Sequence, residues 1–272
     1  MSKFFETASF HIVKPCNMKC KFCYATFQDM RVLAQLSLEE TEDILDKLKA
    51  SGLQKITFAG GEPMLYRWLS EAIRYANKIG LTTSIITNGS FITEKWLDDL
   101  TWELSWIGIS IDSLNPKTNE LIGRTGSKIP DYYELIKWIN DRSFKLKINT
   151  VVNRYNQYES MQDFIDWADP DRWKIFDTLK VEGQNDGQFE EIKSTDFEYF
   201  VSQHSHPNMV VENNEAMTGS YLLIDPQGRL FENSAGHHTY SDKLQTSTVR
   251  DCLRQINLNR DMFEKRGGVY EW

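Results

Sequence analysis

A chain of 272 residues is long enough for one large hydrophobic core, and this length favours a single α/β domain. With 40% apolar and 26% charged residues, 7 prolines and 15 glycines, the composition excludes a disordered, collagen-like or low-complexity protein. The formal net charge of −8 argues against a protein that coats nucleic acid, because neutralising phosphates requires an excess of Lys and Arg.

Short runs rich in Val, Ile and Phe alternate with amphipathic stretches along the first two thirds of the chain. The runs predict strands near residues 9–13, 55–59, 82–87, 106–111, 145–151 and 173–180. The stretches predict helices at residues 37–50, 69–78, 94–100, 132–141 and 157–167. The first of these opens with Ser37 and Glu40, the pair that forms a capping box. Four tryptophans in or near the helical patterns are expected to anchor the core: Trp68, Trp96, Trp102 and Trp138.

Strands that alternate with helices of this length form βαβ units. We therefore expect an α/β fold in which a parallel sheet, with helices outside it, curls into a partial six-unit barrel. The alternation stops after about residue 183. Residues 183–188, GQNDGQ, predict an exposed loop, and residues 225–228, DPQG, predict a hairpin turn. Residues 1–182 should form the barrel, and residues 183–272 an α+β cap that closes it within the same structural unit.

The sequence shows no sign of a membrane segment. No window approaches the roughly 18 uninterrupted apolar residues that a membrane-spanning helix needs. The first residues, MSKFFETASFHIV, also lack the order of charged, apolar and small residues that marks an export signal. We therefore expect a cytoplasmic protein with no membrane partner.

Three of the four cysteines, Cys16, Cys20 and Cys23, lie within eight residues. In a reducing cytosol such a cluster is more typical of a metal site than of disulfides, and three thiols cannot pair among themselves. The cluster directly follows the first predicted strand, which in barrels of this kind is the catalytic face. Three thiolates leave an iron–sulfur cluster one ligand short, so one iron keeps a position open for a small molecule.

A zinc knuckle is the alternative reading of the same cysteines. It would need a distant fourth ligand, with His11, His204, His206 and Cys252 as candidates. Zinc ligands usually come as two pairs, and the histidines show no pairing at ligand spacing beyond His204 and His206. Spacing and position therefore favour the iron–sulfur cluster, and Cys252 is expected to be a small buried apolar residue.

The motif Cys-x3-Cys-x2-Cys followed by Tyr24 resembles the signature of the radical S-adenosylmethionine (SAM) superfamily. Residues 60–63, Gly-Gly-Glu-Pro, resemble its GGEP motif after the second strand. Glycines at a strand end let the backbone approach a ligand, and a carboxylate there can accept a hydrogen bond from an ammonium group. Further runs resemble viperin and its prokaryotic relatives, from about residue 10 to the end: residues 87–90, 109–113, 121–124, 147–156, 172–176 and 265–272.

The resemblance implies two cofactors, a [4Fe-4S] cluster and SAM. It implies that three irons are bound by Cys16, Cys20 and Cys23 while the fourth iron chelates SAM. Further cofactor contacts are implied at Tyr24, Gly60, Gly61, Glu62, Asn88, Ser110 and Arg124.

Independently of the resemblance, three predicted strands have a basic face. Apolar side chains alternate with Lys or Arg in residues 55–59, 144–151 and 172–176. A barrel strand turns its apolar face to the helices, so the basic faces should converge on the interior. Burying several cations alone would be prohibitively costly, which predicts an anionic ligand or buried carboxylates. Lys55 and Lys145, each taken singly, could equally reach solvent at a strand end.

The resemblance implies that this anion is a nucleoside triphosphate. Its site residues would be Lys55, Lys147, Asn149, Arg172, Lys174 and Arg266, with Tyr221 near the ribose as a contact or catalytic proton donor. Arg suits phosphate because it can bind two oxygens at once, whereas Lys acts as a point charge.

The implied activity is that of a nucleotide dehydratase. An electron from the cluster cleaves SAM, and the resulting 5′-deoxyadenosyl radical removes the hydrogen at the ribose 4′ carbon of CTP, UTP or GTP. Loss of the 3′ hydroxyl as water, then gain of one electron and a proton, leaves a 3′-deoxy-3′,4′-didehydro nucleotide. The implied partners are the nucleotide and an electron donor such as flavodoxin or ferredoxin, and the implied role is antiviral defence.

Two alternatives stay open at this point. One is a radical SAM enzyme with another substrate, such as a purine precursor or a peptide. The other is a non-enzymatic zinc-binding module. The base of a nucleotide would be read by loops, notably residues 183–188 and 213–220, where the resemblance is thinnest.

Overall fold

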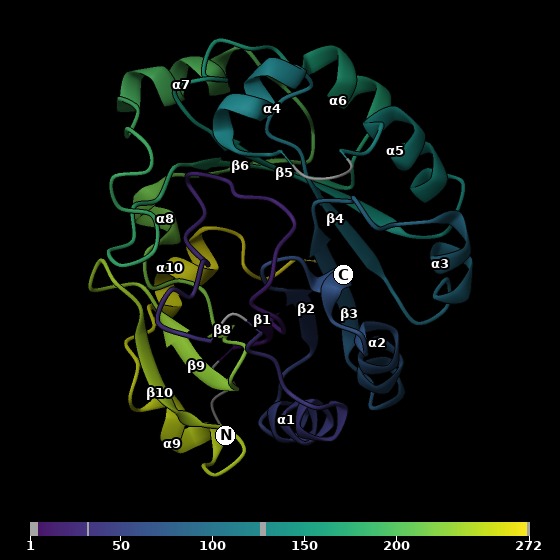
Figure 1. Ribbon diagram of the computed structural model, residues 1–272, viewed down its shortest axis with the longest axis vertical. Coiled ribbons are helices and arrows are strands. Elements are labelled where there is room, and N and C mark those ends of the chain that lie inside the picture. The colour runs from purple at the N-terminus through teal and green to yellow at the C-terminus, as the bar shows by residue number, and fades with distance from the viewer. Residues whose placement is uncertain (1–4, 32, 126–128, 271–272) are drawn as a thin grey trace.

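A computed structural model describes residues 5–31, 33–125 and 129–270, and its strands form one continuous sheet. The ten strands of these residues stand in the order β10-β9-β8-β1-β2-β3-β4-β5-β6-β7 (Figure 1). Their bounds are β1 Thr7–His11, β2 Lys55–Ala59, β3 Thr82–Thr87, β4 Trp106–Ser110, β5 Lys145–Val152, β6 Arg172–Asp177, β7 Met209–Glu212, β8 Leu223–Ile224, β9 Arg229–Glu232 and β10 Thr239–Lys243.

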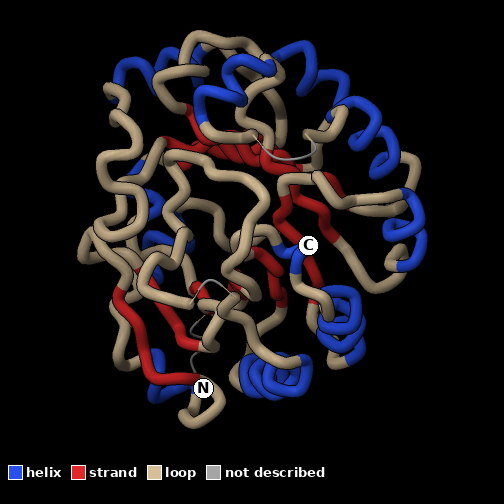
Figure 2. Tube along the Cα trace, in the orientation of Figure 1, coloured by secondary structure: helices blue, strands red, loops and turns tan. Residues whose placement is uncertain are grey.

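Helices cover the outer side of the curved sheet (Figure 2). Their bounds are α1 Leu38–Ala50, the 3-10 turn η1 Pro63–Leu65, α2 Leu69–Lys78, α3 Glu94–Asp99, α4 Pro116–Ile122, α5 Tyr132–Asn140, α6 Gln162–Ala168, α7 Ser194–Ser202, α8 Asn214–Met217, α9 Val249–Leu253 and α10 Arg260–Lys265. β1 to β7 are parallel and neighbours in chain order. This arrangement confirms the predicted partial barrel and extends it by one strand, β7.

The crossover helices form where apolar residues recur on one face. Helix α1 begins at the predicted capping box: the Ser37 hydroxyl accepts the Glu40 N–H (3.2 Å), and the Glu40 carboxylate accepts the Ser37 N–H (2.9 Å). Its apolar residues Ile44, Leu45 and Leu48 are buried in the main core. Packing of this kind on the outer side leaves the inner side of the sheet for polar residues.

The helix predicted at residues 157–167 begins only at Gln162. The Asn156 side-chain amide donates to the carbonyl oxygens of Asp112 (2.7 Å) and Val151 (3.0 Å), and the segment before the helix forms turns. Asparagine favours such local bonds over helix, which explains the late start.

Two further expectations differ from the structure. The strand predicted at residues 173–180 ends at Asp177. Trp102 lies in the turn between α3 and β4 with 88% of its surface exposed, so its prediction as a core anchor was wrong. The other three tryptophans pack, partly buried, against the core.

The loop predicted at residues 183–188 is not exposed throughout, because Gln184 and Asn185 are buried. The Gln184 side-chain carbonyl accepts the Phe27 N–H (2.7 Å), and the Asn185 amide donates to the carbonyl of Phe22 (3.0 Å). These contacts fix the segment after β6 against the segment that carries the cysteines. The sequence predicts an exposed loop because the hydrogen-bond partners of Gln184 and Asn185 lie far away along the chain.

Residues beyond 183 extend the sheet at both edges. β7 lies beside β6, whereas β8 is parallel to β1 and continues into the antiparallel strands β9 and β10. The predicted turn joins β8 and β9, where the Gly228 N–H donates to the Asp225 carbonyl (3.0 Å). In the described part of the chain, no helix combines the length and apolar character needed to cross a membrane.

Candidate active site

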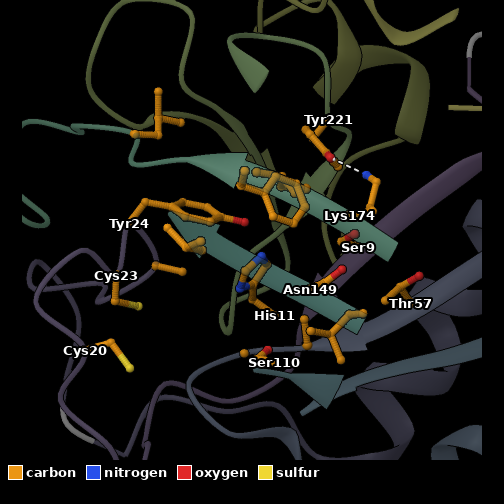
Figure 3. A pocket seen from close by; sticks show the side chains of 18 of the residues that line it. Ser9, His11, Cys20, Cys23, Tyr24, Thr57, Ser110, Asn149, Lys174 and Tyr221 are labelled. Atoms are coloured by element: carbon orange, nitrogen blue, oxygen red, sulfur yellow. Dashed lines mark hydrogen bonds between the residues drawn. The ribbon is translucent and has the colours of Figure 1, made fainter. Parts of the chain in front are cut away.

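A cavity of about 750 Å³ is lined by the inward-facing residues of the sheet. The segment after β1 and the segment after α10 complete its walls. Arg172 is not among the lining residues. Every other predicted site residue lines the cavity: Cys16, Cys20, Cys23, Tyr24, Lys55, Gly60, Gly61, Glu62, Asn88, Ser110, Arg124, Lys147, Asn149, Lys174, Tyr221 and Arg266. Figure 3 shows two of the cysteines facing the same space as Lys174 and Tyr221, from the opposite side.

The cysteines lie on the segment that follows β1. Cys16 is exposed, whereas Cys20 and Cys23 are half-buried. Burial raises the pKa of Cys23 to about 12 and raises that of Cys20 as well. The thiols therefore hold their protons in the free protein and must lose them to bind a metal.

No three His, Cys, Asp or Glu side chains of the described residues could hold a single metal ion. Two of the four candidate zinc ligands, His204 and Cys252, have other partners, whereas His11 lines the cavity and its Nδ1 has no hydrogen-bond partner. Both ring nitrogens of His204 are hydrogen-bonded, to the Met161 N–H (2.9 Å) and the Phe200 carbonyl (2.6 Å). Cys252 is fully buried and donates to the Asp242 carbonyl. A four-iron cluster fits the cysteines better than zinc does, because it takes one thiolate at each iron and the thiols need not meet at one point.

The glycines of the GGEP motif let β2 end directly against the cysteine segment. The Gly61 N–H donates to the Val13 carbonyl (2.7 Å). A Cβ on Gly61 would lie 2.1 Å from the Lys14 carbonyl oxygen and 2.2 Å from that of Pro15. Only a residue without a side chain allows the two backbone segments to come this close. The GGEP motif therefore positions the cysteine segment.

Glu62 places a buried carboxylate beside that segment. It is 1% exposed and accepts hydrogen bonds from the Thr87 hydroxyl (2.6 Å), the Asn88 N–H (2.9 Å) and the Met64 N–H (3.1 Å). Burial raises its pKa, and the three donors oppose that shift. The Asn88 amide also donates to Asn17 (2.8 Å), which links this corner to the cysteines.

Arg124 and Asp112 form a buried ion pair on the same side of the cavity. Burial alone would lower the pKa of Arg124, but the Asp112 carboxylate raises it. The residue before Arg124 is a glycine that accepts the Lys19 N–H (3.0 Å) through its carbonyl. The cysteine segment is thus fixed from the ends of several strands.

The amino ends of the strands form a basic region. Lys55, only 1% exposed, donates to the Tyr270 hydroxyl (2.7 Å), and Lys147 donates to the same oxygen (3.0 Å). The Arg172 guanidinium lies 4.0 Å from the centre of the Tyr270 ring, and Trp106 packs edge-on to that ring. Burial lowers the pKa of Lys55 to about 5 and that of Lys147 to about 7.

Glu212 lies among a second set of basic side chains, next to the first. It is fully buried, forms an ion pair with Lys174 and lies 3.6 Å from Arg266. The Tyr221 hydroxyl donates to Glu212 and accepts a hydrogen bond from Lys174 (2.8 Å; Figure 3). Burial alone would raise the pKa of Glu212, but Lys174 and Arg266 lower it. The Arg266 guanidinium also lies 3.5 Å from the centre of the Tyr221 ring.

Sequence reasoning missed Glu212, Tyr270 and Trp106. Glu212 ends a short strand whose pattern carries no motif, and Tyr270 reaches the site only because the last segment folds back over β2 and β5. Between the cysteines and the basic region lies a layer of neutral polar side chains, labelled in Figure 3: Ser9, Thr57, Ser110 and Asn149.

Comparisons with known proteins point to one family. The Radical SAM superfamily matches residues 12–168. The chain is 42% identical to the S-adenosylmethionine-dependent nucleotide dehydratase of Lacinutrix mariniflava, over 98% of this chain but 58% of that protein. It is also 42% identical to the protein of that name from Flammeovirga pacifica, over 98% of this chain and 96% of that protein.

A solved structure shows the same fold without close sequence similarity. Streptococcus suis SuiB bound to S-adenosylmethionine superimposes with a TM-score of 0.72 at 17% identity, over 98% of this chain and 68% of that one. Similarity at this level supports the architecture alone. Together with the superfamily match and the two dehydratases, it leads to one conclusion: the chain belongs to the radical SAM superfamily and, within it, to the family of S-adenosylmethionine-dependent nucleotide dehydratases.

Proposed function

We propose that this protein is a radical SAM dehydratase that converts a nucleoside triphosphate, CTP, UTP or GTP, to its 3′-deoxy-3′,4′-didehydro derivative. The main support for the proposal is that thiols and buried cations line opposite sides of the same cavity. The sugar of a nucleotide whose phosphates lie among the cations would reach the neutral polar layer, next to the cysteines.

The cysteine side of the cavity fits the cofactors that the superfamily uses, a [4Fe-4S] cluster and SAM. Cys16, Cys20 and Cys23 would hold the cluster. The backbone at Gly60 and Gly61 and the side chains of Tyr24, Glu62, Asn88, Ser110 and Arg124 would bind SAM. When bound, these cofactors supply a reactive carbon radical that can remove a hydrogen atom from the sugar.

The basic side supplies binding and orientation. Lys147, Lys174 and Arg266 line it, with Arg172 behind the Tyr270 ring. Several buried cations are costly without an anion, so a triphosphate would relieve a cost already present in the free protein. Holding the sugar in place also protects the protein, because a carbon radical would otherwise attack its neighbours.

Tyr221 is the residue we propose as ribose contact and proton donor to the leaving hydroxyl. Its hydroxyl lies between an acceptor, Glu212, and a donor, Lys174, so a proton that Tyr221 gives up can be replaced from Lys174. An electron donor such as flavodoxin or ferredoxin would supply the reducing equivalents, and chain-terminating nucleotides would serve antiviral defence.

Anaerobic turnover tests the proposal. The reconstituted enzyme is incubated with SAM, dithionite and each of the four ribonucleoside triphosphates, and the products are identified by mass spectrometry. We expect deoxyadenosine together with one nucleotide that has lost the elements of water. Deoxyadenosine formation that is the same with every nucleotide and without any would contradict the proposal.

Variants separate the two sides of the cavity. Lys174→Ala and Arg266→Ala should keep the iron content of wild type and weaken triphosphate binding at least about tenfold, the loss of one charge-assisted contact. The control is Lys49→Ala, which removes a half-buried lysine far from the cavity lining whose ammonium group donates to the Gly80 carbonyl. Equal affinity in all three variants would rule out the triphosphate site.

A further inference from the structure

His11 is a polar side chain of the cavity to which the proposed function gives no role. It is the last residue of β1, it is 4% exposed, and it lines the cavity together with Ser9 of the neutral polar layer. Figure 3 shows its ring inside the cavity, near Tyr24. Side chains on one face of a strand lie about 7 Å apart, so His11 stands one such step closer to the cysteine segment than Ser9 does.

The His11 ring is uncharged and has hydrogen-bonding capacity that the protein does not use. Burial lowers its pKa to about 3, with a smaller contribution from His238, whereas the Gly60 backbone acts in the opposite direction. Its Nδ1 atom is buried and has no hydrogen-bond partner among the described residues. A buried polar atom without a partner is costly, and few occur in folded proteins. The free protein thus carries a cost that a ligand bound beside the ring would remove.

Packing alone does not explain a histidine at this position. Its neighbours are aromatic: the ring centres of Phe231, Phe27 and Tyr24 lie 5.4, 5.5 and 6.1 Å from that of His11, all edge-on. A phenylalanine would fill the same space without a polar atom to desolvate. The register partner of His11 on β2 is the small residue Ala59, which also lines the cavity. A ligand in the cavity can therefore approach the ring.

The chemistry of the ring indicates which ligand group it would contact. A neutral imidazole has one donor and one acceptor, so it suits a hydroxyl, which can also donate and accept. It cannot neutralise phosphate, for which Lys147, Lys174 and Arg266 line the cavity. No three metal-binding side chains of the described residues meet there to hold an ion. SAM and a nucleoside triphosphate each carry a ribose, and its hydroxyls are groups of the required kind.

We propose that His11 hydrogen-bonds to a ribose hydroxyl of a bound nucleoside and so fixes the orientation of the sugar. The nucleoside has two sources. One is the triphosphate, for which the inference rests on the proposed function. The other is SAM, the cofactor that the superfamily of this chain uses. In either case the contact restrains the sugar itself, which charge interactions with phosphates alone would leave free to rotate.

Binding to the anaerobically reconstituted protein tests the contact. SAM is titrated first, and then CTP, UTP and GTP and their 2′-deoxy and 3′-deoxy forms are titrated with SAM present. In the wild type, the deoxy form that lacks the contacted hydroxyl should bind more weakly than the ribonucleotide. In His11→Phe the affinity for the ribonucleotide should fall about fivefold, as expected for the loss of one hydrogen bond, and the preference over that deoxy form should disappear.

Two further variants make the result specific. His11→Gln keeps a donor and an acceptor and should recover part of the preference that His11→Phe loses. His237→Phe changes an exposed histidine outside the cavity lining and should leave every affinity at the wild-type value. A weaker SAM affinity in His11→Phe, with the preference for the ribonucleotide intact, would assign the contact to the ribose of SAM.

The outcome that overturns the inference is equally clear. If His11→Phe binds SAM and every nucleotide as the wild type does, His11 contacts no ribose. Lower thermal stability of that variant with wild-type affinities would show a structural role only. If the wild type binds no nucleotide, the proposed function itself fails, and the titrations with SAM still decide whether His11 contacts the cofactor.

Discussion

Burial sets the ionisation of the residues that meet in the cavity. It raises the pKa values of the cysteine thiols and lowers those of the lysines, so each group is biased towards its neutral form until a partner arrives. We propose a metal as the partner of the thiols and an anion as the partner of the lysines. Glu212 is the exception, because Lys174 and Arg266 keep it charged.

Gly61→Ala tests whether the GGEP motif must lie directly against the cysteine segment, because it adds a single carbon atom at that contact. The new Cβ would lie within 2.2 Å of two backbone oxygens of the cysteine segment, which cannot move without displacing Cys16. We expect a folded protein with clearly less iron than wild type after reconstitution, measured by iron analysis and circular dichroism. Gly187→Ala is the control, because nothing lies within 4 Å of that glycine and only a backbone strain of about 1–2 kcal/mol results. Wild-type iron content in Gly61→Ala would show that the close backbone contact at Gly61 is not needed for iron binding.

Cys20→Ala tests the assignment of the thiols. Loss of one of three ligands should abolish both the iron–sulfur absorbance and the activity. Cys252→Ala removes the fourth cysteine, which is fully buried in the core, so it should lower the stability by about 1 kcal/mol and leave the iron unchanged. Iron loss from Cys252→Ala instead would revive the zinc-type alternative with a distant ligand.

The segment after α10 contacts the basic residues of three strands. The Gly267 carbonyl accepts from Arg172 (2.9 Å), and Tyr270 is the common acceptor of Lys55 and Lys147. The segment thus closes the basic side of the cavity from the amino ends of the strands. Water reaching this side would raise the effective dielectric and weaken every charge interaction there.

Removal of the residues after Gly267 tests this closure. The truncated chain keeps Arg266, so any loss is due to residues 268–272, of which Gly268 and Tyr270 line the cavity. We expect the affinity for the triphosphate to fall about tenfold, equivalent to about 1.4 kcal/mol, while SAM affinity stays at the wild-type value. Val269→Ala is the control, since Val269 is half exposed and its loss should change neither affinity. Equal weakening of SAM binding would indicate general damage instead.

The sequence predicts helices and strands with repeated patterns well, and contacts between distant residues poorly. The alternation in residues 145–151 identified both β5 and its basic face, because strand geometry depends only on neighbouring residues. Glu212 and Tyr270 could not be found in this way, since their roles depend on where β7 and the last segment lie in the fold. The burial of Gln184 and Asn185 was missed for the same reason. The domain boundary near residue 183 and the roles of the individual site residues stay predictions.

For the whole molecule, the distribution of charge matters more than its sum. The chain has a net charge of −8, yet buried cations gather at one side of the cavity. The acidic exterior disfavours contact with nucleic acid, while the cavity attracts a small polyanion. Matching of the whole chain to nucleotide dehydratases confirms the family that the motifs indicated.

Proton uptake is the property of the whole molecule that this arrangement predicts. Burial lowers the pKa of Lys147 to about 7, so at pH 8 this lysine is largely neutral in the free protein. A bound triphosphate favours its charged form and raises this pKa, so binding at pH 8 must take up protons. Between pH 7 and 9 the charge of the nucleotide is nearly constant, and its affinity should therefore fall as the pH rises. Calorimetry in two buffers of different ionisation enthalpy measures the uptake. Lys147→Met should reduce it and Lys49→Met should not, whereas binding heats independent of the buffer would contradict the coupling.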